Sequence, residues 1–90
     1  MNDQYKIGIV IVTWNGKHHL EQLLPFLFMQ DTDKKYKIVI VDNASTDGTK
    51  EFLENYKEID YIQLSQNQGF AEPNNIGIQY LFLKYSLKVL

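Results

Sequence analysis

The stretch Lys37-Ile-Val-Ile-Val41 decides the fold of this chain. A continuous run of β-branched residues is typical of a strand that is buried on both faces. The stretch Lys6-Ile-Gly-Ile-Val-Ile-Val12 repeats the pattern nearer the start of the chain. Residues Ile59 to Leu64 predict a third strand, which is weaker because polar residues interrupt it.

Helical patterns separate these strands. Apolar residues that recur at three- and four-residue spacing predict a helix after each strand, with one apolar face turned to the sheet. The predicted stripes are Leu20, Leu23, Leu24, Leu27 and Phe28; Phe52, Leu53 and Tyr56; and Ile78, Leu81, Phe82 and Tyr85. Pro25 falls inside the first helix. Ser45 is the expected N-cap of the second helix, with Asp47 in its first turn.

This order is β-α-β-α-β-α, and Leu87 to Leu90 suggest the start of a fourth strand. Strands that alternate with helices imply right-handed crossovers and a mostly parallel sheet covered on both faces. The sequence therefore predicts an α/β fold, a three-layer α/β/α arrangement of the Rossmann-like type. Its 90 residues allow one small domain.

The composition excludes several classes of protein. Without cysteine there is no disulfide framework, zinc ribbon or thiol nucleophile. A net charge of −2 and the lack of a basic cluster argue against nucleic-acid binding. No apolar run is long enough for a membrane span, and no signal peptide is visible. We therefore expect a cytoplasmic protein.

Polar residues follow each predicted strand. They are Thr13-Trp14-Asn15, Asp42-Asn43 and Gln66-Asn67-Gln68-Gly69. Because parallel strands end at the same edge of a sheet, where such folds bind their ligands, these three loops are expected to converge on one site. This convergence is the main functional signal in the residues themselves.

Each of these residues has a second interpretation. Asp42 can accept hydrogen bonds from a nucleobase or a ribose, or it can merely cap the turn that follows its strand. Thr13 and Asn15 can line a pocket, Asn15 also capping the first helix, or Asn15-Gly16 can be only a tight helix entry. The ring of Trp14 can stack on a base or simply pack at the rim.

Two glycines and several charged residues have similar alternatives. Gly69 suggests a positive φ or a close approach of the backbone, and Gly77 inside a helix suggests close packing or an approaching ligand. The adjacent His18 and His19 point in different directions and predict a solvated helix face rather than a metal site. Asp31 and Asp33 are expected in a solvent-exposed loop at the opposite edge of the sheet.

Several nucleotide-binding and catalytic signatures are missing from the sequence. No G-x-G-x-x-G follows the first strand, and there is neither a phosphate-binding G-x-x-x-x-G-K-[ST] loop nor a G-x-S-x-G elbow. A dinucleotide-binding domain is therefore disfavoured, and the lack of an acidic cluster after the first strand disfavours a receiver domain.

The sequence resembles the opening of the family 2 glycosyltransferases of the GT-A fold, most closely the rhamnosyltransferase-like branch. The resemblance rests on three stretches, which keep the family's order and spacing and span nearly the whole chain. They are Ile9-Val-Ile-Val-Thr-Trp-Asn-Gly16, Ile38-Val-Ile-Val-Asp-Asn-Ala-Ser-Thr-Asp-Gly-Thr49, and Asn67-Gln-Gly-Phe-Ala71 with Asn75-Ile-Gly-Ile78.

The resemblance implies a UDP- or dTDP-sugar donor and transfer of its sugar to an acceptor hydroxyl. In this reading Thr13, Trp14 and Asn15 belong to the loop that touches the nucleotide. Asp42, followed by Asn43, matches the carboxylate that holds the base or ribose. The segment that closes over the nucleotide is matched by Asn67, Gly69, Phe70 and Asn75.

The chain departs from the family pattern in two places. Glu72-Pro73 stands where small residues are common, and the chain ends before the Asp-x-Asp-like motif that binds Mg²⁺ or Mn²⁺ in the family. We therefore expect residues 1–90 to be the nucleotide-binding half of the domain, without metal ligands or catalytic residues and inactive alone. An uncovered sheet edge predicts a homo-oligomer. The alternative is an inactive interaction or regulatory module that retains the fold.

Overall fold

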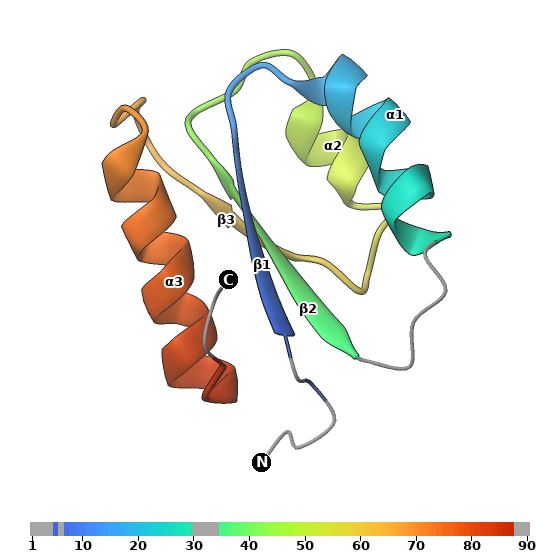
Figure 1. Ribbon diagram of the computed structural model, residues 1–90. Helices are drawn as coiled ribbons and strands as arrows, with labels where there is room; N and C mark the ends of the chain where they lie inside the picture. The colour runs from blue at the N-terminus through green and yellow to red at the C-terminus, as the bar shows by residue number, and fades with distance from the viewer. Residues whose placement is uncertain (1–4, 6, 30–34, 88–90) are drawn as a thin grey trace.

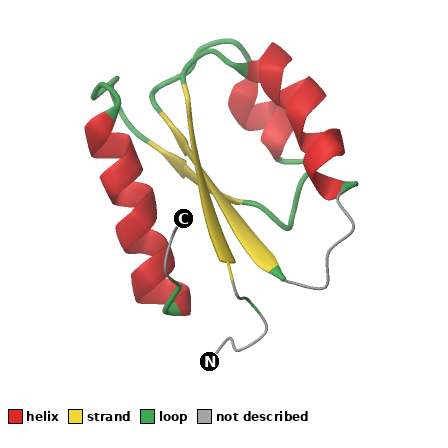
Figure 2. Ribbon diagram, viewed as in Figure 1, coloured by secondary structure: helices red, strands yellow, loops and turns green. Residues whose placement is uncertain are grey.

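The chain forms a three-stranded parallel sheet between two layers of helices (Figures 1 and 2). The computed structural model describes residues 5, 7–29 and 35–87. The elements are β1 (Ile7–Thr13), α1 (Lys17–Phe28), β2 (Tyr36–Asp42), α2 (Thr49–Leu53), β3 (Asp60–Gln63) and α3 (Ala71–Tyr85). The predicted α/β class and three-layer arrangement are thus confirmed.

The sheet has the order β1-β2-β3, which places β2 in the centre. Its register aligns the carboxyl ends of the strands, because Thr13 pairs with Asp42 and Asp42 pairs with Gln63. The apolar run of β2 is buried throughout, as its continuous β-branched sequence predicts. All three predicted strands are found, with bounds that shift by one residue.

Helices α1 and α2 cover one face of the sheet (Figure 1). The core on this face is formed by Leu20, Leu24, Ile38, Ile40, Leu53 and Ile59. Ile38 and Ile40 alternate with Val39 and Val41 along β2, so the period-two rule sends the isoleucines to this face and the valines to the other. Pro25 lies inside α1, as predicted.

Helix α3 covers the opposite face and approaches the sheet closely at Gly77. A Cβ atom at this position would lie 2.6 Å from Cγ1 of Val10 and 3.2 Å from Cγ2 of Val41. The close-packing interpretation of this glycine is therefore confirmed. The buried stripe of α3 is Pro73, Gly77 and Leu81.

The predicted apolar face of the third helix is partly wrong. Leu81 is buried, but Ile78 and Phe82 are 42% and 58% exposed. The small side chain of Gly77, rather than the large apolar ones, determines which face of α3 meets the sheet. Pro73 also belongs to the buried face of α3, whereas Glu72 beside it is exposed.

The second helix also differs from the prediction. It spans only five residues, and Tyr56 of the predicted stripe lies beyond its end. Its N-cap is Gly48, with a φ of 89°, so the prediction of Ser45 as the N-cap is wrong. Asp47 precedes the helix instead of lying in its first turn. The reason lies in the pairing of two loops, which is described with the site.

Some predictions fall outside the described residues. Leu87 is buried after the end of α3, but the remainder of the predicted fourth strand, residues 88–90, lies outside the described part. The same is true of Asp31 and Asp33 and of Lys6. Within the described part, no helix has both the length and the apolar character that a membrane crossing requires.

Candidate functional site

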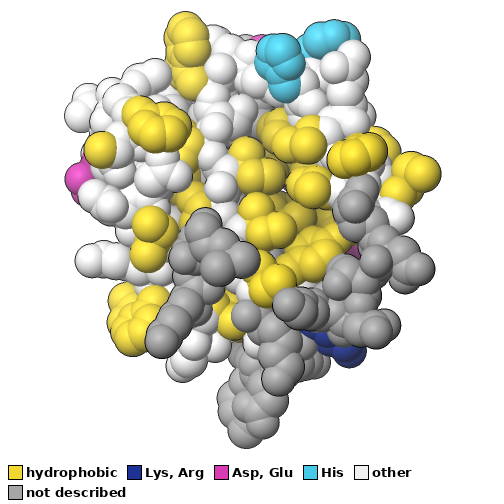
Figure 3. All heavy atoms as spheres, in the orientation of Figure 1, with side chains coloured by type: hydrophobic (Ala, Val, Ile, Leu, Met, Phe, Trp, Pro, Cys, Tyr) yellow, Lys and Arg dark blue, Asp and Glu magenta, His cyan; other side chains and the backbone are white. Residues whose placement is uncertain are grey.

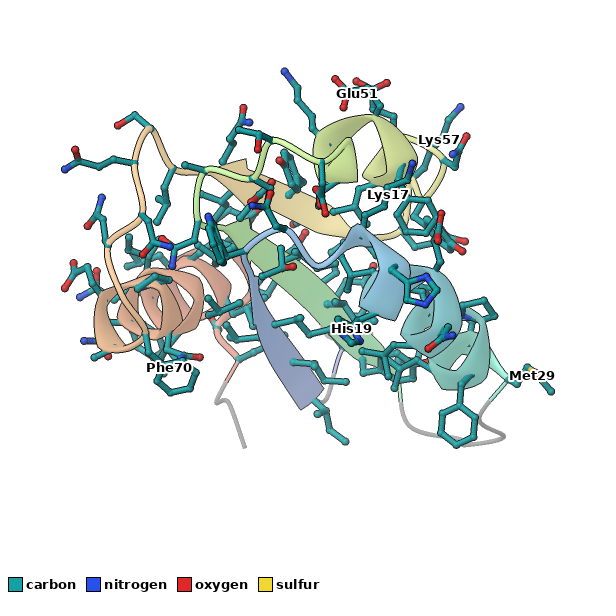
Figure 4. The ribbon with its side chains drawn as sticks, turned by 90° about the horizontal axis from the view of Figure 1, so that it is seen from above. Lys17, His19, Met29, Glu51, Lys57 and Phe70 are labelled. Carbon is teal, nitrogen blue, oxygen red and sulfur yellow. The ribbon has the colours of Figure 1, made fainter. Side chains whose placement is uncertain are left out.

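The loops that follow the three strands meet at the carboxyl edge of the sheet, as predicted. Two backbone hydrogen bonds extend the strand pairing by one step: the amide of Asn43 donates to the carbonyl of Thr13 at 2.8 Å, and the amide of Leu64 donates to the carbonyl of Asp42 at 2.8 Å. Figure 4 looks down on this edge, with Phe70 at the start of α3 on one side of the sheet and Lys17 at the start of α1 on the other.

Asp42 lies at the centre of this edge and is completely buried. Its Oδ1 accepts a hydrogen bond from the backbone amide of Ser45 at 3.0 Å, and its Oδ2 accepts one from the hydroxyl of Tyr61 at 2.5 Å. Burial raises the pKa of Tyr61, and the hydrogen bond to Asp42 raises it further. The turn-capping interpretation of Asp42 is therefore confirmed, while each carboxylate oxygen keeps the capacity for a second bond.

Asn43 faces the α3 side and holds the loop that follows β3. Its Nδ2 donates to the carbonyl of Gly69 at 2.6 Å, and its Oδ1 accepts from the amide of Gln68 at 2.8 Å. Within that loop the amide of Gly69 donates to Oδ1 of Asn67 at 2.8 Å. Because the Asn43 side chain is buried and both of its polar atoms are engaged, it positions this loop.

Gly69 has a φ of 80°, which confirms the predicted positive φ. A Cβ atom at this position would have no neighbour within 4 Å, so the requirement is conformational rather than steric. The left-handed turn lets the chain bend from the loop into α3.

The loops after β1 and β2 bind each other through Asn15 and Ser45. The amide of Asn15 donates to Oγ of Ser45 at 2.7 Å, and the amide of Thr46 donates to Oδ1 of Asn15 at 2.8 Å. Asn15 itself has a φ of 50°. The N-cap of α1 is Gly16, with no side-chain cap, so the prediction that Asn15 caps this helix is wrong.

Asp47 connects the starts of α1 and α2. Its Oδ2 accepts from the amide of Lys17 at 3.1 Å, and its Oδ1 accepts from the amide and the hydroxyl of Thr49 at 3.2 and 2.5 Å. The hydrogen bond from the Thr49 hydroxyl, supported by these backbone amides, holds the pKa of Asp47 below its ordinary value. One carboxylate therefore binds the first amide of both helices, and its bond to Lys17, 30 residues away, is one that no local pattern indicates.

The remaining candidates differ in exposure. Thr13 is buried, and its hydroxyl lies so close to Gly16 that a Cβ there would be 2.5 Å from Oγ1. Trp14 and Phe70 are 59% and 77% exposed, and Asn75 is exposed on α3. The rings of Trp14 and Phe70 are thus available to a ligand, whereas the Thr13 side chain shapes the bend after β1.

A shallow cavity of about 420 Å³ lies between the loops that follow β2 and β3. It is lined by Ala44, Ser45, Thr46, Gln63, Leu64 and Ser65. Its lining is mostly polar, and Ser45 connects it directly to Asp42. Sequence reasoning did not single out Ser45 or Tyr61 as parts of the site, because their partners lie far from them in the chain.

The acidic groups at this edge do not form a metal site. Asp42 and Asp47 are both engaged in hydrogen bonds, and the described residues contain no group of three or more His, Asp or Glu side chains placed to hold an ion. His18 and His19 are exposed on α1, where His18 faces Glu21 at 3.8 Å, which confirms the predicted solvated helix face.

Comparisons with known proteins agree with this geometry. The family model for glycosyl transferase family 2 matches residues 8–85, and the chain therefore belongs to this family. The rhamnosyltransferase WbbL of Escherichia coli is 32% identical over 79 residues, which cover 88% of this chain and 29% of that protein. The dTDP-rhamnosyl transferase RfbF of Shigella flexneri is 33% identical over 85 residues, which cover 93% of this chain and 27% of that protein.

Solved structures share the fold. TarS residues 1–349 of Staphylococcus aureus, in complex with UDP-GlcNAc, has a TM-score of 0.76 and 30% identity over 83% of this chain and 23% of that one. The mannosyltransferase PcManGT of Pyrobaculum calidifontis, in complex with GDP-Man and Mn²⁺, has a TM-score of 0.71 at 24% identity. Both are GT-A glycosyltransferases, so the chain has part of a GT-A domain. It spans less than a third of the length of these relatives.

Proposed function

We propose that the carboxyl edge of the sheet binds the nucleotide of a UDP- or dTDP-sugar, as the donor-binding half of a glycosyltransferase domain. The observation that carries the proposal is the convergence of three loops, joined by Asn15 and Asn43, on one edge of a parallel sheet. Family membership supports it, as does the similar TarS structure, which was solved with UDP and with UDP-GlcNAc.

The exposed aromatic rings supply surfaces for the ligand. The indole of Trp14 can stack on the base, because a nucleobase presents an apolar face to an aromatic ring. Phe70 and Asn75 lie on the α3 side of the sheet. They would face the ribose or the diphosphate when the loop at Asn67 and Gly69 closes over the nucleotide. The start of α3 also lies at this edge and presents amides that favour an anion, whereas the first amide of α1 is bound by Asp47.

The polar residues at the centre supply the hydrogen bonds. Asp42 accepts donors of the base or ribose through its remaining lone pairs. Because the carboxylate is buried, contact requires the groups that cover it to move aside while the bonds from Ser45 and Tyr61 are kept. Thr13 and Asn15 shape the loop that carries Trp14. In this proposal Asn43 acts through the loop that it holds.

Sugar transfer itself needs groups beyond this edge. In the family a divalent Mg²⁺ or Mn²⁺ neutralises the diphosphate leaving group, and a base takes the proton of the acceptor hydroxyl. The engaged carboxylates Asp42 and Asp47 do not fit a metal. We propose that residues 1–90 bind the donor and do not catalyse transfer alone. We further propose a cytoplasmic location, which the lack of cysteine fits.

A titration with UDP, followed by amide chemical shifts, tests the proposal. We expect the amides of Asn15, Ser45 and Gln68 to shift with UDP at millimolar concentration, and Trp14→Ala to weaken the binding. Asn55→Ala, at an exposed site after α2, is the matched control and leaves binding unchanged. Parallel titrations with dTDP and GDP report which base is preferred. If UDP and dTDP shift no amide at this edge, the chain is instead the inactive module that retains the fold.

We also propose that the chain self-associates through the outer edge of β1. This strand is seven residues long and uncharged, and such an edge offers unpaired backbone groups to a second strand. Large apolar side chains of the helices remain exposed, among them Leu23 and Phe26 on α1 and Ile78 and Phe82 on α3. Figure 3 shows apolar side chains gathered over β1 and both flanking helices.

A further inference from the structure

We infer that Tyr61 is a positioning residue, whose hydroxyl orients the Asp42 carboxylate for the nucleotide. The inference rests on the proposed function, because it takes Asp42 as an acceptor for the base or ribose. Tyr61 belongs to none of the stretches that carry the family resemblance. The contact emerges only from the folded structure.

The register of the sheet explains how Tyr61 reaches Asp42. Tyr61 pairs with Ile40 on β2, and residues two apart on a strand share a face, so Ile40, Asp42 and Tyr61 all point toward the α1 and α2 layer. The long side chain of Tyr61 then extends along the sheet to Oδ2 of Asp42, at 2.5 Å. A phenylalanine would fill the same space without the bond.

Two donors fix the plane of the carboxylate. The hydroxyl of Tyr61 binds Oδ2 and the amide of Ser45 binds Oδ1, from two different segments of the chain. With one donor on each oxygen, rotation about the Cβ–Cγ bond would break both contacts. The second lone pair of each oxygen is therefore held in a defined direction, which is what a directional hydrogen bond from a ligand requires.

The surroundings keep Tyr61 a donor. Its ring packs against the core under α1 and α2, and burial together with Asp42 raises the pKa of its hydroxyl. The hydroxyl is therefore protonated at neutral pH. A fully buried carboxylate without such donors would be costly, so the pair also stabilises the fold. A test must separate these two effects.

The chain offers a matched control in Tyr80. Its hydroxyl donates to Oδ2 of Asp60 at 2.5 Å, the same kind of bond at the same length. Asp60 pairs with Val39, three residues before Asp42 on β2, and Tyr80 belongs to α3 on the other face of the sheet, so this bond lies away from Asp42. Tyr80→Phe therefore removes a bond of the same kind away from the candidate site, and Asp60 keeps its bonds to Tyr85 and Lys37.

The experiment measures UDP affinity by calorimetry for the wild type, Tyr61→Phe, Tyr80→Phe, Asp42→Asn and the double variant Asp42→Asn with Tyr61→Phe. We expect Tyr61→Phe to weaken UDP binding about fivefold to tenfold, since a bond to a charged group is lost. Tyr80→Phe should change the affinity by less than about twofold, although it also lowers the melting temperature. In the double variant, Tyr61→Phe should add no loss to that of Asp42→Asn.

The outcomes are distinct. If wild-type protein binds neither UDP nor dTDP, the proposed function fails before Tyr61 is tested. If the wild type binds UDP, two results overturn the role of Tyr61. One is an equal UDP affinity of Tyr61→Phe and Tyr80→Phe. The other is a double variant in which the losses of UDP affinity of the two single variants add. If a variant does not fold, a measurement on the wild type still tests the inference. Bound UDP must then shift the NMR signals of both the Asp42 carboxyl carbon and the Tyr61 Cζ carbon. If either signal stays unshifted, the inference is wrong.

Discussion

The side-chain amide of Asn43 donates to the carbonyl oxygen of Gly69 at 2.6 Å and so joins the end of β2 to a loop 26 residues further along the chain. The oxygen of the same amide receives the backbone N–H of Gln68 at 2.8 Å. One buried side chain thereby fixes the turn that leads into α3, on which the geometry of the candidate site depends.

Replacing Asn43 by alanine should remove both bonds and lower the free energy of unfolding by about 2 kcal/mol, at roughly 1 kcal/mol for each net hydrogen bond. Chemical denaturation measures this loss, and hydrogen exchange at Gln68 should accelerate. Asn55→Ala is the control, because its amide bonds Phe52 at the surface. An unchanged exchange rate at Gln68 would contradict the assigned role of Asn43.

Gly77→Ala should destabilise the protein although alanine favours helices. The added Cβ would lie 2.6 Å from Val10, and such overpacking costs about 1–3 kcal/mol, more than the helix propensity gain of about 1 kcal/mol. Urea denaturation measures the balance. Val10→Ala in the same chain should recover part of the loss that Gly77→Ala causes. A single Gly77→Ala variant more stable than wild type would show that α3 does not need this close approach.

Acid should destabilise the fold through Asp47 and Asp60. The hydrogen bond from Thr49 lowers the pKa of Asp47; burial raises that of Asp60, but bonds from Tyr80, Tyr85 and Lys37 outweigh it and lower the pKa. A carboxylate whose pKa is lower in the folded chain than its ordinary value of 3.8 stabilises the fold at pH values above 3.8. This stabilisation is lost as the pH falls through the pKa of the folded state.

Asp47→Asn should therefore flatten the acid limb of the stability curve. Urea midpoints measured between about pH 2.5 and 6 test this expectation. Glu72→Gln, at an exposed position, controls for the loss of one negative charge. A variant curve parallel to that of the wild type over this range would show that Asp47 titrates alike in the folded and unfolded chain.

Phe82→Lys should weaken self-association without loss of stability, because Phe82 is exposed on α3, which packs against β1. Sedimentation velocity over a range of protein concentrations measures the association. Leu83→Lys is the matched control: it adds the same charge one residue further on α3, at a side chain that is 78% exposed. If the wild-type protein sediments as a monomer at every concentration, the proposed self-association is wrong.

The sequence allowed the strands, their order along the chain and the convergence of their loops to be predicted, because these depend on local periodicity and on rules for parallel sheets. The face of α3 was mistaken at Ile78 and Phe82, since the close approach at Gly77 depends on Val10 and Val41 of two other elements. Side-chain size along one helix carries no information about that fit.

The cap of α2 was mistaken for a related reason. Ser45 is a good N-cap by type, but its hydroxyl accepts the amide of Asn15, 30 residues away. Tyr61 escaped notice because its bond to Asp42 needs the β2–β3 register, which a weak third strand does not reveal. Local rules thus predicted the convergence of the loops, whereas long-range pairing determines which hydrogen bonds each side chain makes there.

The reciprocal bonds between Asn15 and the Ser45–Thr46 segment have a consequence for motion. Neither loop can swing outward alone without breaking both of these bonds. Opening at this end of the sheet should therefore be cooperative, a single exchange process shared by both segments. Relaxation dispersion at the Asn15 and Thr46 amides would then report one common rate.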